Sequence, residues 1–461
     1  MDWTKSDRGI GSLEHEPPMK SRRAAILATV AAAAGAGAGF RYLSSAAKHP
    51  SEFVGMSPAK AKELGLKTLS FVHYNDLHGH YKPRNYNGRF LSPLSLIRGY
   101  FDQVKAENPN SLFCNAGDDM EKGSLVDLIS RGEGTIEINQ HLGLDLRAVG
   151  NHDFAYGRDS LKRFLEVPGG VVLCSNHAIG AKNYHQFEMD GVRVGVFSMV
   201  GRPWNELNQQ YDGPYFQGFA CRYDFTAVAN ELIHKYRRGV DLLFMLSHLG
   251  LSIDEQIAAE TEGLDFIIGG HSHTVLETPM RSANGTLIVQ AGAYGNFVGR
   301  LDIMVEAKSR RISGFHYVLT PVSPAGMNPD LALETRIVDV CQRYAPKADA
   351  PITNLPHQLS KLEVAKLASE AAISVFGVDA AVIDVDTVWR ELPAGPVSRQ
   401  DLLDAFSVEI QPPGTHGFNS MMTGTLKVSD WRIIERMAGH SFVVSSRPGP
   451  KGSQPVVAHG N

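Results

Sequence analysis

Short apolar segments alternate with helical segments through the middle of this 461-residue chain, and this alternation restricts the fold more than any other feature. Such alternation predicts an α/β core. The strand candidates are residues 69–74, 112–115, 146–149, 171–174, 192–199, 242–246 and 266–268, and the helix candidates are residues 94–105, 134–141 and 225–237. Residues 286–318 are richer in strand patterns, which look antiparallel.

Composition excludes several classes of protein. The chain has 45 Lys and Arg against 49 Asp and Glu, a net charge of −4, so we predict no nucleic-acid polymer as a partner. Hydrophobic residues make up 43%, which excludes a wholly disordered or collagen-like chain. Cys114, Cys174, Cys221 and Cys341 are far apart, so we expect no disulfide framework and no structural zinc site, although one disulfide stays open.

The first 50 residues resemble an export signal. The pair Arg22-Arg23 precedes an Ala- and Gly-rich, mildly apolar run over residues 24–39. This order resembles a twin-arginine signal, and the small residues 45–47 offer a cleavage site. The apolar run is short of the roughly 20 residues that a membrane span needs, and an uncleaved anchor is the alternative. We therefore interpret residues 1–50 as a signal peptide with a polar leader, and we expect a protein that is periplasmic or anchored facing the periplasm.

Polar motifs directly follow five of the apolar strand segments. The motifs are Asp76-Leu77-His78, Gly117-Asp118, Gly150-Asn151-His152-Asp153, Ser247-His248 and Gly270-His271-Ser272-His273. Taken singly, most of them are more typical of a turn or a surface loop. The carboxyl ends of strands in an open α/β sheet border one crevice, so five such motifs in order indicate one shared site.

Seven side chains in these motifs are candidate ligands for a pair of divalent metal ions. Asp118 is the candidate bridge, because one carboxylate can share its two oxygens between two ions. One shell would be completed by Asp76, His78 and His273, and the other by Asn151, His248 and His271. Two ions about 3.5–4 Å apart can activate water and stabilise an oxyanion, and phosphoester hydrolysis requires both.

The segments NDLHGH, AGDDMEKGS, VGNHDFAYG, LSHLG and GGHSH resemble those of the calcineurin-like metallophosphoesterase superfamily, and most closely its branch of exported 5′-nucleotidases. This resemblance covers about residues 68–320. It implies a four-layer α/β/β/α sandwich over residues 66–322 that binds two divalent ions, such as Mn, Zn, Fe or Co, through the ligands above. It also implies that His152 stabilises the transition state or protonates the leaving group.

The sequence departs from the 5′-nucleotidase pattern near His152. In that pattern, an aspartate three residues after the histidine orients the ring, whereas this chain has Ala155. Asp153 is adjacent to His152, and adjacent side chains usually diverge. Either another part of the chain supplies the orienting partner, or His152 works without one. The segment AGDDMEKGS is also one residue longer than the usual form.

Residues 345–440 resemble a reduced form of the 5′-nucleotidase C-terminal domain. A helix pattern over 362–375 and a strand pattern over 380–383 predict a smaller α+β domain. Arg390 matches an arginine that binds phosphate in the family, although the glycines around it are missing, and a surface arginine is the alternative. Phe406 is a candidate for stacking on a nucleobase, and the buried end of an amphipathic helix is the alternative.

Prolines 321, 324 and 329 mark the expected boundary between the two domains. Residues 445–461 are rich in Gly, Pro and Ser, and the sequence predicts a disordered tail there.

These features together predict a dinuclear-metal phosphoesterase whose substrate is a small phosphoester, with 5′-nucleotides as candidates. In this hypothesis a metal-activated hydroxide attacks phosphorus, Asn151 holds the nonbridging oxygens, and His152 is the acid or electrostatic catalyst. Two alternatives stay open. One is an enzyme similar to the thiosulfohydrolase of sulfur oxidation, whose pattern departs from the Asn151-His152 pair kept here. The other is a catalytically silent metal-binding protein.

Overall fold

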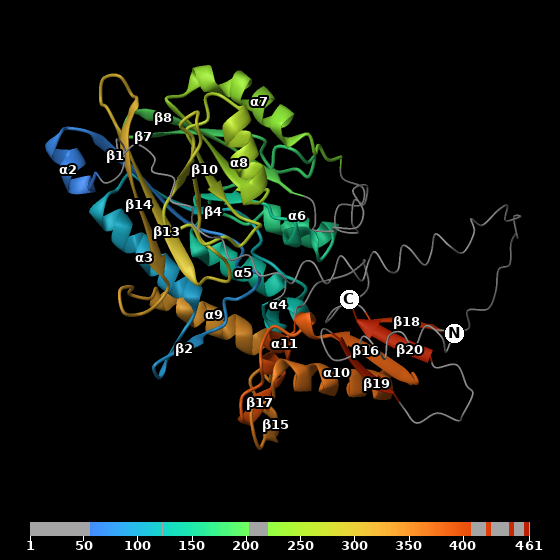
Figure 1. The fold of residues 1–461 in the computed structure, drawn as a ribbon. Helices are drawn as coiled ribbons and strands as arrows, with labels where there is room; N and C mark the ends of the chain where they lie inside the picture. Colours follow the sequence, from blue (N-terminus) through green and yellow to red (C-terminus); the bar gives the residue numbers. More distant parts are fainter. Residues whose placement is uncertain are drawn as a thin grey trace, which may run out of the picture. The chain divides into compact units, whose positions relative to one another are not determined.

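The chain forms two six-stranded sheets. Figure 1 labels strands of both. The structure is a computed structural model that describes residues 56–121, 123–201, 220–406, 421–425, 442–446 and 456–460. The predicted signal peptide at residues 1–50 lies outside the described residues.

The first sheet has the strand order β14-β13-β1-β4-β5-β6. Its strands are β1 (Lys67–Tyr74), β4 (Ser111–Asn115), β5 (Leu146–Ala148), β6 (Val171–Leu173), β13 (Phe297–Val305) and β14 (Ile312–Pro321). Strands β1, β4, β5 and β6 are parallel, and β13 and β14 add to β1 in antiparallel order.

The second sheet has the order β11-β12-β10-β9-β8-β7. Its strands are β7 (His185–Met189), β8 (Val192–Val200), β9 (Leu242–His248), β10 (Phe266–Gly269), β11 (Met280–Arg281) and β12 (Leu287–Gln290). Its four inner strands are parallel, and the two edge strands are antiparallel to their neighbours. The expected antiparallel pairing over residues 286–318 therefore holds for β13 and β14, whereas β12 is parallel to β10.

Side chains of β1 point alternately into the core between the sheets and to the outer face of the first sheet. Leu69 and Phe71 belong to the cluster between the sheets, whereas Val72 and Tyr74 belong to the cluster on the outer face of the first sheet. Successive side chains of a strand point to opposite faces, so a run that is apolar on both faces must be covered on both. The Phe71 ring packs 5.2 Å from that of Phe244 in the second sheet. Complete burial of such a side chain contributes about 1.5–3 kcal/mol.

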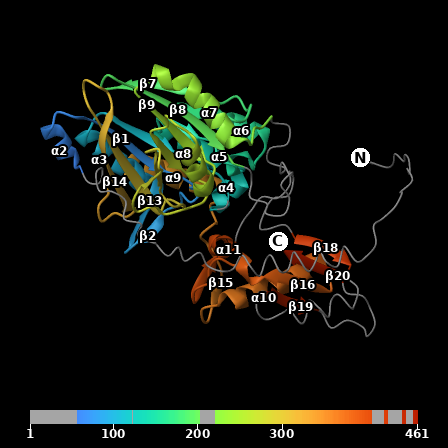
Figure 2. The same cartoon turned by 45° about the horizontal axis from the view of Figure 1, so that its top comes forward.

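Helices cover the outer faces of both sheets (Figure 2). The first sheet is covered by α3 (Pro93–Glu107), α4 (Leu125–Ser130), α5 (Glu133–Leu142) and α9 (Leu331–Tyr344), with α6 (Arg158–Leu165) near β6, and the second by α7 (Phe225–Tyr236) and α8 (Leu251–Glu260). The four-layer α/β/β/α architecture predicted from the sequence is confirmed. Helix α9 follows the expected boundary yet packs on α5, because Leu333, Ile337 and Val340 complete the first sheet's outer core.

Three shorter elements complete this part of the chain, namely α2 (Pro58–Glu63), β2 (Arg84–Tyr86) and β3 (Arg89–Leu91), together with 3-10 turns at His152–Phe154 and Arg237–Gly239. The four cysteines are free, in agreement with the absence of a disulfide framework expected from their spacing. Among the described residues, no helix has both the length and the apolar character needed to cross a membrane.

The C-terminal part combines helices with small sheets, as the predicted α+β class requires. Its elements are β15 (Pro351–Leu355), α10 (Lys361–Phe376), β16 (Ala380–Asp384), a 3-10 turn at Val385–Thr387, β17 (Gly395–Ser398), α11 (Arg399–Ala405), β18 (Met421–Thr425), β19 (Phe442–Ser446) and β20 (Val456–Gly460). Ser360 and Glu363 form a capping box that begins α10, and Gly377 ends the helix in the left-handed conformation.

The expected disorder of residues 445–461 is wrong for two segments. Residues 445–446 belong to β19, which pairs with β16, and β20 pairs with both β16 and β18. The prediction rested on the Gly- and Pro-rich composition of the whole tail. It overlooked the short apolar run Val456-Val457-Ala458, which suits a strand and forms backbone hydrogen bonds with β16 and β18.

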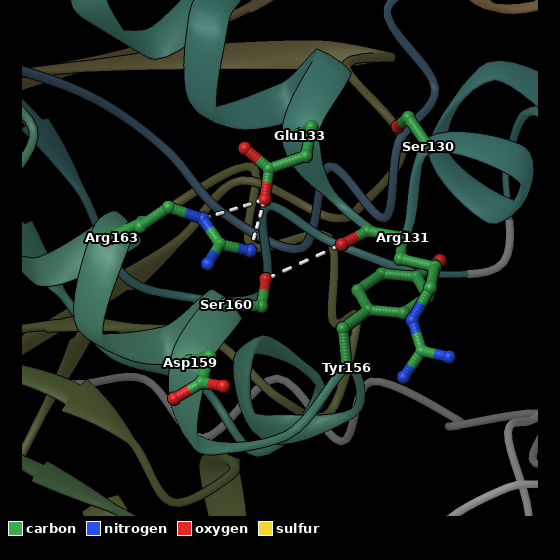
Figure 3. Close-up of a pocket in the computed structure, with 7 residues that line it drawn as sticks. All are labelled: Ser130, Arg131, Glu133, Tyr156, Asp159, Ser160 and Arg163. Atoms are coloured by element: carbon green, nitrogen blue, oxygen red, sulfur yellow. Dashed lines mark hydrogen bonds and ion pairs between the residues drawn. The ribbon is translucent and has the colours of Figure 1, made fainter.

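A hollow of about 380 Å³ lies between the start of α5 and α6 (Figure 3). Arg163 points toward Glu133 and donates a 2.7 Å hydrogen bond from Nε, and Ser160 Oγ donates to the Arg131 carbonyl. None of the predicted metal ligands lines this hollow.

Candidate metal centre

The five polar motifs lie at or just beyond the carboxyl ends of β1, β4, β5, β9 and β10. Five of the seven predicted ligands have positive φ angles: Asp76, His78, Asp118, His271 and His273, between 49° and 73°. Residues other than glycine rarely adopt this conformation, and it persists where the surrounding structure enforces it, which is common at functional sites. The backbone thus turns each side chain off its strand and toward a common centre.

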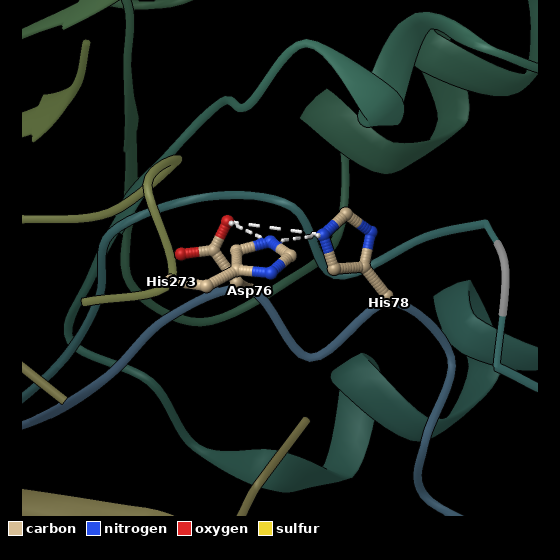
Figure 4. A group of neighbouring side chains, drawn as sticks. All are labelled: Asp76, His78 and His273. Atoms are coloured by element: carbon tan, nitrogen blue, oxygen red, sulfur yellow. Dashed lines mark hydrogen bonds and ion pairs between the residues drawn. The ribbon is translucent and has the colours of Figure 1, made fainter. Parts of the chain in front are cut away.

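Asp76, His78 and His273 form the first group of side chains that could hold a metal ion (Figure 4). His273 Nε2 lies 3.3 Å from Asp76 Oδ1, and His78 Nε2 lies 3.1 Å from His273 Nε2. Asp76 and His78 are completely buried, whereas the side chain of His273 is 30% exposed. One edge of this group therefore faces the outside.

Asp118, His248 and His271 form a second group, and His78, Asp118 and His152 form a third. In each group one ligand atom per residue lies within 4.8 Å of the others. Asp118 Oδ2 lies 2.9 Å from His248 Nε2 and 3.6 Å from His78 Nε2. Asp118 therefore lies between the side chains that the sequence assigns to two different shells.

Hydrogen bonds from the surrounding chain orient the ligands. Asn75 Nδ2 donates to Asp76 Oδ2 at 2.6 Å, and the backbone N–H of His271 donates to the same carboxylate at 2.9 Å. His248 Nδ1 lies 2.7 Å from the carbonyl oxygen of Ala116, so a proton on Nδ1 leaves Nε2 as the ligand atom. Partners of this kind commonly set the tautomer and direction of metal-binding histidines.

Asp153 holds the backbone of the site rather than the ring of His152. Its carboxylate accepts hydrogen bonds from the N–H groups of Gly150 at 2.8 Å, Asp118 at 3.2 Å, Asp119 at 3.0 Å and Met120 at 3.2 Å. This buried carboxylate ties the loop after β4 to the loop after β5. The expectation that Asp153 and His152 diverge agrees with this geometry.

Charges within the cluster shift the pKa values of its members. Burial raises the pKa of Asp118, but nearby His248 and His152 outweigh it and hold that pKa well below its usual range. Burial lowers the pKa of His248, but the carboxylate of Asp118 outweighs it and raises the pKa to about 10. Burial, helped by His248, lowers the pKa of His271 to about 3. Buried carboxylates that depend on adjacent positive charge are what a cation site requires.

The donor set also fits divalent metal ions. Asn151 Oδ1 is buried and accepts no hydrogen bond from the described residues, although a buried amide oxygen normally has a partner. The combination of carboxylate, amide and imidazole donors suits Mn, Fe, Co and Zn alike. The arrangement thus supplies candidate ligands for divalent metal, with an unsatisfied oxygen among them.

His152 has a carboxylate partner that the sequence analysis did not identify. Its Nδ1 contacts Glu121 Oε2, and its backbone N–H donates to Asp118 Oδ1 at 2.8 Å. The extra residue in the segment AGDDMEKGS was the available signal, because it lengthens the loop that carries Glu121.

The predicted substrate residues of the C-terminal part lie in different settings. The side chain of Arg390 is 64% exposed, and its Nη1 lies 3.8 Å from Asp404 Oδ2. Phe406 is partly buried and packs against the small core that includes Val388 and Leu392.

Trp389 was missed, although it precedes Arg390 directly. Its ring centroid lies 6.1 Å from that of Tyr294, and the Tyr294 ring lies 5.1 Å from that of His273. Aromatic side chains from the two parts of the chain therefore meet beside the exposed edge of the ligand cluster.

The fold is a four-layer α/β/β/α sandwich with candidate metal ligands at its strand ends. Residues 69–275 match the calcineurin-like phosphoesterase family, and this part of the chain forms a calcineurin-like phosphoesterase domain. Among solved structures, a 5′-nucleotidase precursor from Thermus thermophilus has a similar fold, with a TM-score of 0.66 and 21% identity over 86% of this chain and 89% of that one.

Two curated proteins illustrate the sequence relatives. Endonuclease YhcR of Bacillus subtilis is 24% identical over 416 residues, which cover 77% of this chain and 32% of that protein. A probable 5′-nucleotidase of Treponema pallidum is 25% identical over 282 residues, which cover 52% of this chain and 45% of that protein. The chain thus spans less than half the length of both curated relatives.

Proposed function

We propose that this protein is a metal-dependent hydrolase of small phosphoesters, with 5′-nucleotides as the first candidate substrates. The observation that carries the proposal is the position of Asp118, whose carboxylate lies within 4 Å of His78 from the first candidate group and of His248 from the second. A calcineurin-like phosphoesterase domain and a relative named as a probable 5′-nucleotidase support the same class of reaction.

The proposal assigns two divalent ions to the cluster. Asp118 would contribute to the binding of both ions, while Asp76, His78 and His273 would hold one and Asn151, His248 and His271 would hold the other. The proximity of Asp118 Oδ2 to His78 on one side and to His248 on the other supports this division. When bound, the ions would supply an activated water and positive charge for the oxygens of the phosphoryl group.

The other roles belong to the protein's own side chains. Asn151 presents its amide beside the cluster, where the amide N–H donors can hold a nonbridging phosphoryl oxygen while Oδ1 serves as a ligand. His152 donates a proton to the leaving-group oxygen or stabilises its charge. The side chain of His152 is 14% exposed, so a substrate can reach the ring from outside.

Binding of the rest of the substrate is assigned to the C-terminal part. Arg390 is exposed and can bind a phosphate or another anionic group in two-pronged fashion. The packing of Phe406 leaves Trp389 as the better-placed ring for a nucleobase, so the proposed stacking role moves to Trp389. Export through a twin-arginine signal remains part of the proposal and rests on the sequence of residues 1–50.

The first test is phosphate release by protein reconstituted with Mn²⁺. The substrates are 5′-AMP, p-nitrophenyl phosphate and bis-p-nitrophenyl phosphate, so that nucleotide, monoester and diester hydrolysis are compared. The proposal expects turnover of monoesters, with 5′-AMP favoured. Preference for the diester would instead assign a phosphodiesterase, in line with the relative named as an endonuclease. No turnover of any of the three with two metal ions bound would overturn the proposal.

A further inference from the structure

Glu121 contacts His152, a residue that itself belongs to one of the candidate ligand groups. Glu121 Oε2 contacts His152 Nδ1, and the Glu121 side chain is completely buried. Glu121 is absent from the groups of side chains that could hold a metal ion among the described residues. The carboxylate therefore faces the ring of the proposed catalyst without a role as a ligand.

The backbone conformation at Glu121 directs its carboxylate toward His152. Glu121 has a φ of 66°, and its N–H donates to Asp127 Oδ2 at 2.7 Å. The same oxygen of Asp127 accepts a 2.6 Å hydrogen bond from the Tyr156 hydroxyl, so the acceptor is itself fixed in place. A non-glycine residue in this conformation requires support from its surroundings, and the buried Asp127 provides it.

The loop is also held on its far side. The N–H of Gly123 donates to the carbonyl of His78 at 2.5 Å, and Gln400 Nε2 of α11 donates to the Gly123 carbonyl at 3.2 Å. A side chain at Gly123 would collide with the His80 ring and the His78 carbonyl. Hydrogen bonds to His78 and to Gln400 thus fix the position of Gly123.

The positions near His152 in sequence supply no equivalent contact. Ala155 is one helical turn beyond His152 and carries only a methyl group, and Asp153 is used by four backbone N–H groups. The residue that lengthens the loop after β4 brings in a carboxylate at this point instead.

We propose that Glu121 is the positioning residue of His152, a proposal that rests on the proposed function. Nδ1–H of His152 donates to Glu121, which fixes the direction of the ring. The ring acts in its doubly protonated form, so Nε2 also carries a proton and presents it to the substrate. In the reaction, an oxygen from water bonds to phosphorus as the bond to the leaving oxygen breaks. The Nε2 proton passes to that leaving oxygen, and solvent then returns a proton to His152.

The leaving group separates this role from a purely structural one. p-Nitrophenolate leaves with little need of a proton, whereas phenolate needs one. Glu121→Gln is therefore expected to lower kcat for phenyl phosphate by roughly 10- to 100-fold. This is less than the decrease of about 10²–10⁴ expected for loss of a general acid, because the His152 ring is still present. The kcat for p-nitrophenyl phosphate should fall much less, with KM and metal content unchanged for both substrates. Glu166→Gln, at the exposed end of α6, is the matched control.

A second variant tests rescue by an alternative carboxylate. Residues three apart on a helical turn lie on one face, so Ala155→Asp in the Glu121→Ala background is expected to restore much of the lost kcat for phenyl phosphate. A readout without turnover is the ¹⁵N NMR spectrum of the histidine rings in Zn²⁺-loaded protein. Glu121→Ala should alter the Nδ1 signal that disappears in His152→Ala, and should leave the other histidine signals in place.

The outcomes separate the two proposals. Wild-type protein that is inactive on every phosphoester with metal bound would overturn the proposed function. Active wild-type protein whose Glu121→Gln variant loses kcat equally for both leaving groups, or loses metal in parallel with activity, would overturn the role of Glu121 alone. An unchanged His152 signal in Glu121→Ala would do the same.

Discussion

Asp118 Oδ2 and His248 Nε2 lie 2.9 Å apart, and both side chains are almost completely buried. This distance suits two groups that share a cation, and it joins the loop after β4 of the first sheet to the end of β9 in the second. The two sheets thus meet at the candidate metal centre through one carboxylate and one imidazole.

Substitution of Asp118 and of His152 should separate binding from catalysis. Asp118→Asn removes the negative charge of the side chain that is proposed to bind both ions. The number of metal ions bound per chain should therefore fall below two, and the activity should fall with it. His152→Ala should retain metal, while turnover of phosphomonoesters falls by about 10²–10⁴. Metal analysis of both purified variants, alongside kinetics, checks the prediction. Wild-type turnover in His152→Ala would remove that residue from the mechanism.

Asp153→Ala should weaken the site without removing a ligand. Four backbone N–H groups lose their acceptor, among them that of Asp118, and each buried donor left unsatisfied costs about 1–3 kcal/mol. Loss of a partner that supports a ligand typically lowers metal affinity by about 10–100-fold, and we expect a decrease of that order. Competition with a chelator measures the affinity, and thermal unfolding of metal-free protein measures the stability. Unchanged values in both assays would contradict the assigned role.

The sequence predicted most of this site because its ligands follow directly from strand ends. The carboxyl ends of apolar strands such as β1 lie at one edge of the sheets. The residues that directly follow each strand therefore lie near the candidate metal centre, whatever the length of the helices between the strands. Asp76 and His271 are examples, because each follows a strand within two residues and has a positive φ angle.

Glu121, Trp389 and the strand at Val456–Gly460 could not be found in the same way. Glu121 reaches His152 through a left-handed backbone position and a buried acceptor on α4, which are properties of the packed loop rather than of a motif. Trp389 contacts Tyr294, a residue remote from it in the chain, and no local pattern indicates that contact. The strand gains its hydrogen bonds from β16 and β18, which are remote in the chain.

Trp389→Ala should weaken the binding of nucleotides more than that of small esters. The ring is 39% exposed and meets Tyr294 near His273, so it is available to stack on a base. Stacking of a base on an aromatic ring contributes about 1–3 kcal/mol, so KM for 5′-AMP should rise by roughly 5- to 100-fold while that for p-nitrophenyl phosphate stays near the wild-type value. Phe376→Ala, which removes an exposed ring from α10, is the control. Equal increases in KM for both substrates would count against a role in base stacking.

Asp254 should make the stability of the metal-free protein depend on pH. Burial raises its pKa to about 8, and Ser247 Oγ donates a hydrogen bond to its Oδ1. Between the ordinary value near 4 and about 8, the folded protein keeps a proton on this carboxyl that the unfolded chain has released. The free energy of unfolding therefore decreases as pH rises through this window, with a slope of up to about 1.4 kcal/mol per pH unit from this group.

Asp254→Asn keeps a neutral side chain of similar shape at all pH values and should remove that part of the slope. Urea unfolding of both proteins at intervals from pH 5 to pH 8 measures it. The free energy of unfolding of the variant should increase relative to that of the wild type as pH rises. The two values should differ least at pH 5, where the wild-type carboxyl is protonated in the folded state. Parallel curves across the range would show that the carboxyl of Asp254 is not protonated in the folded protein.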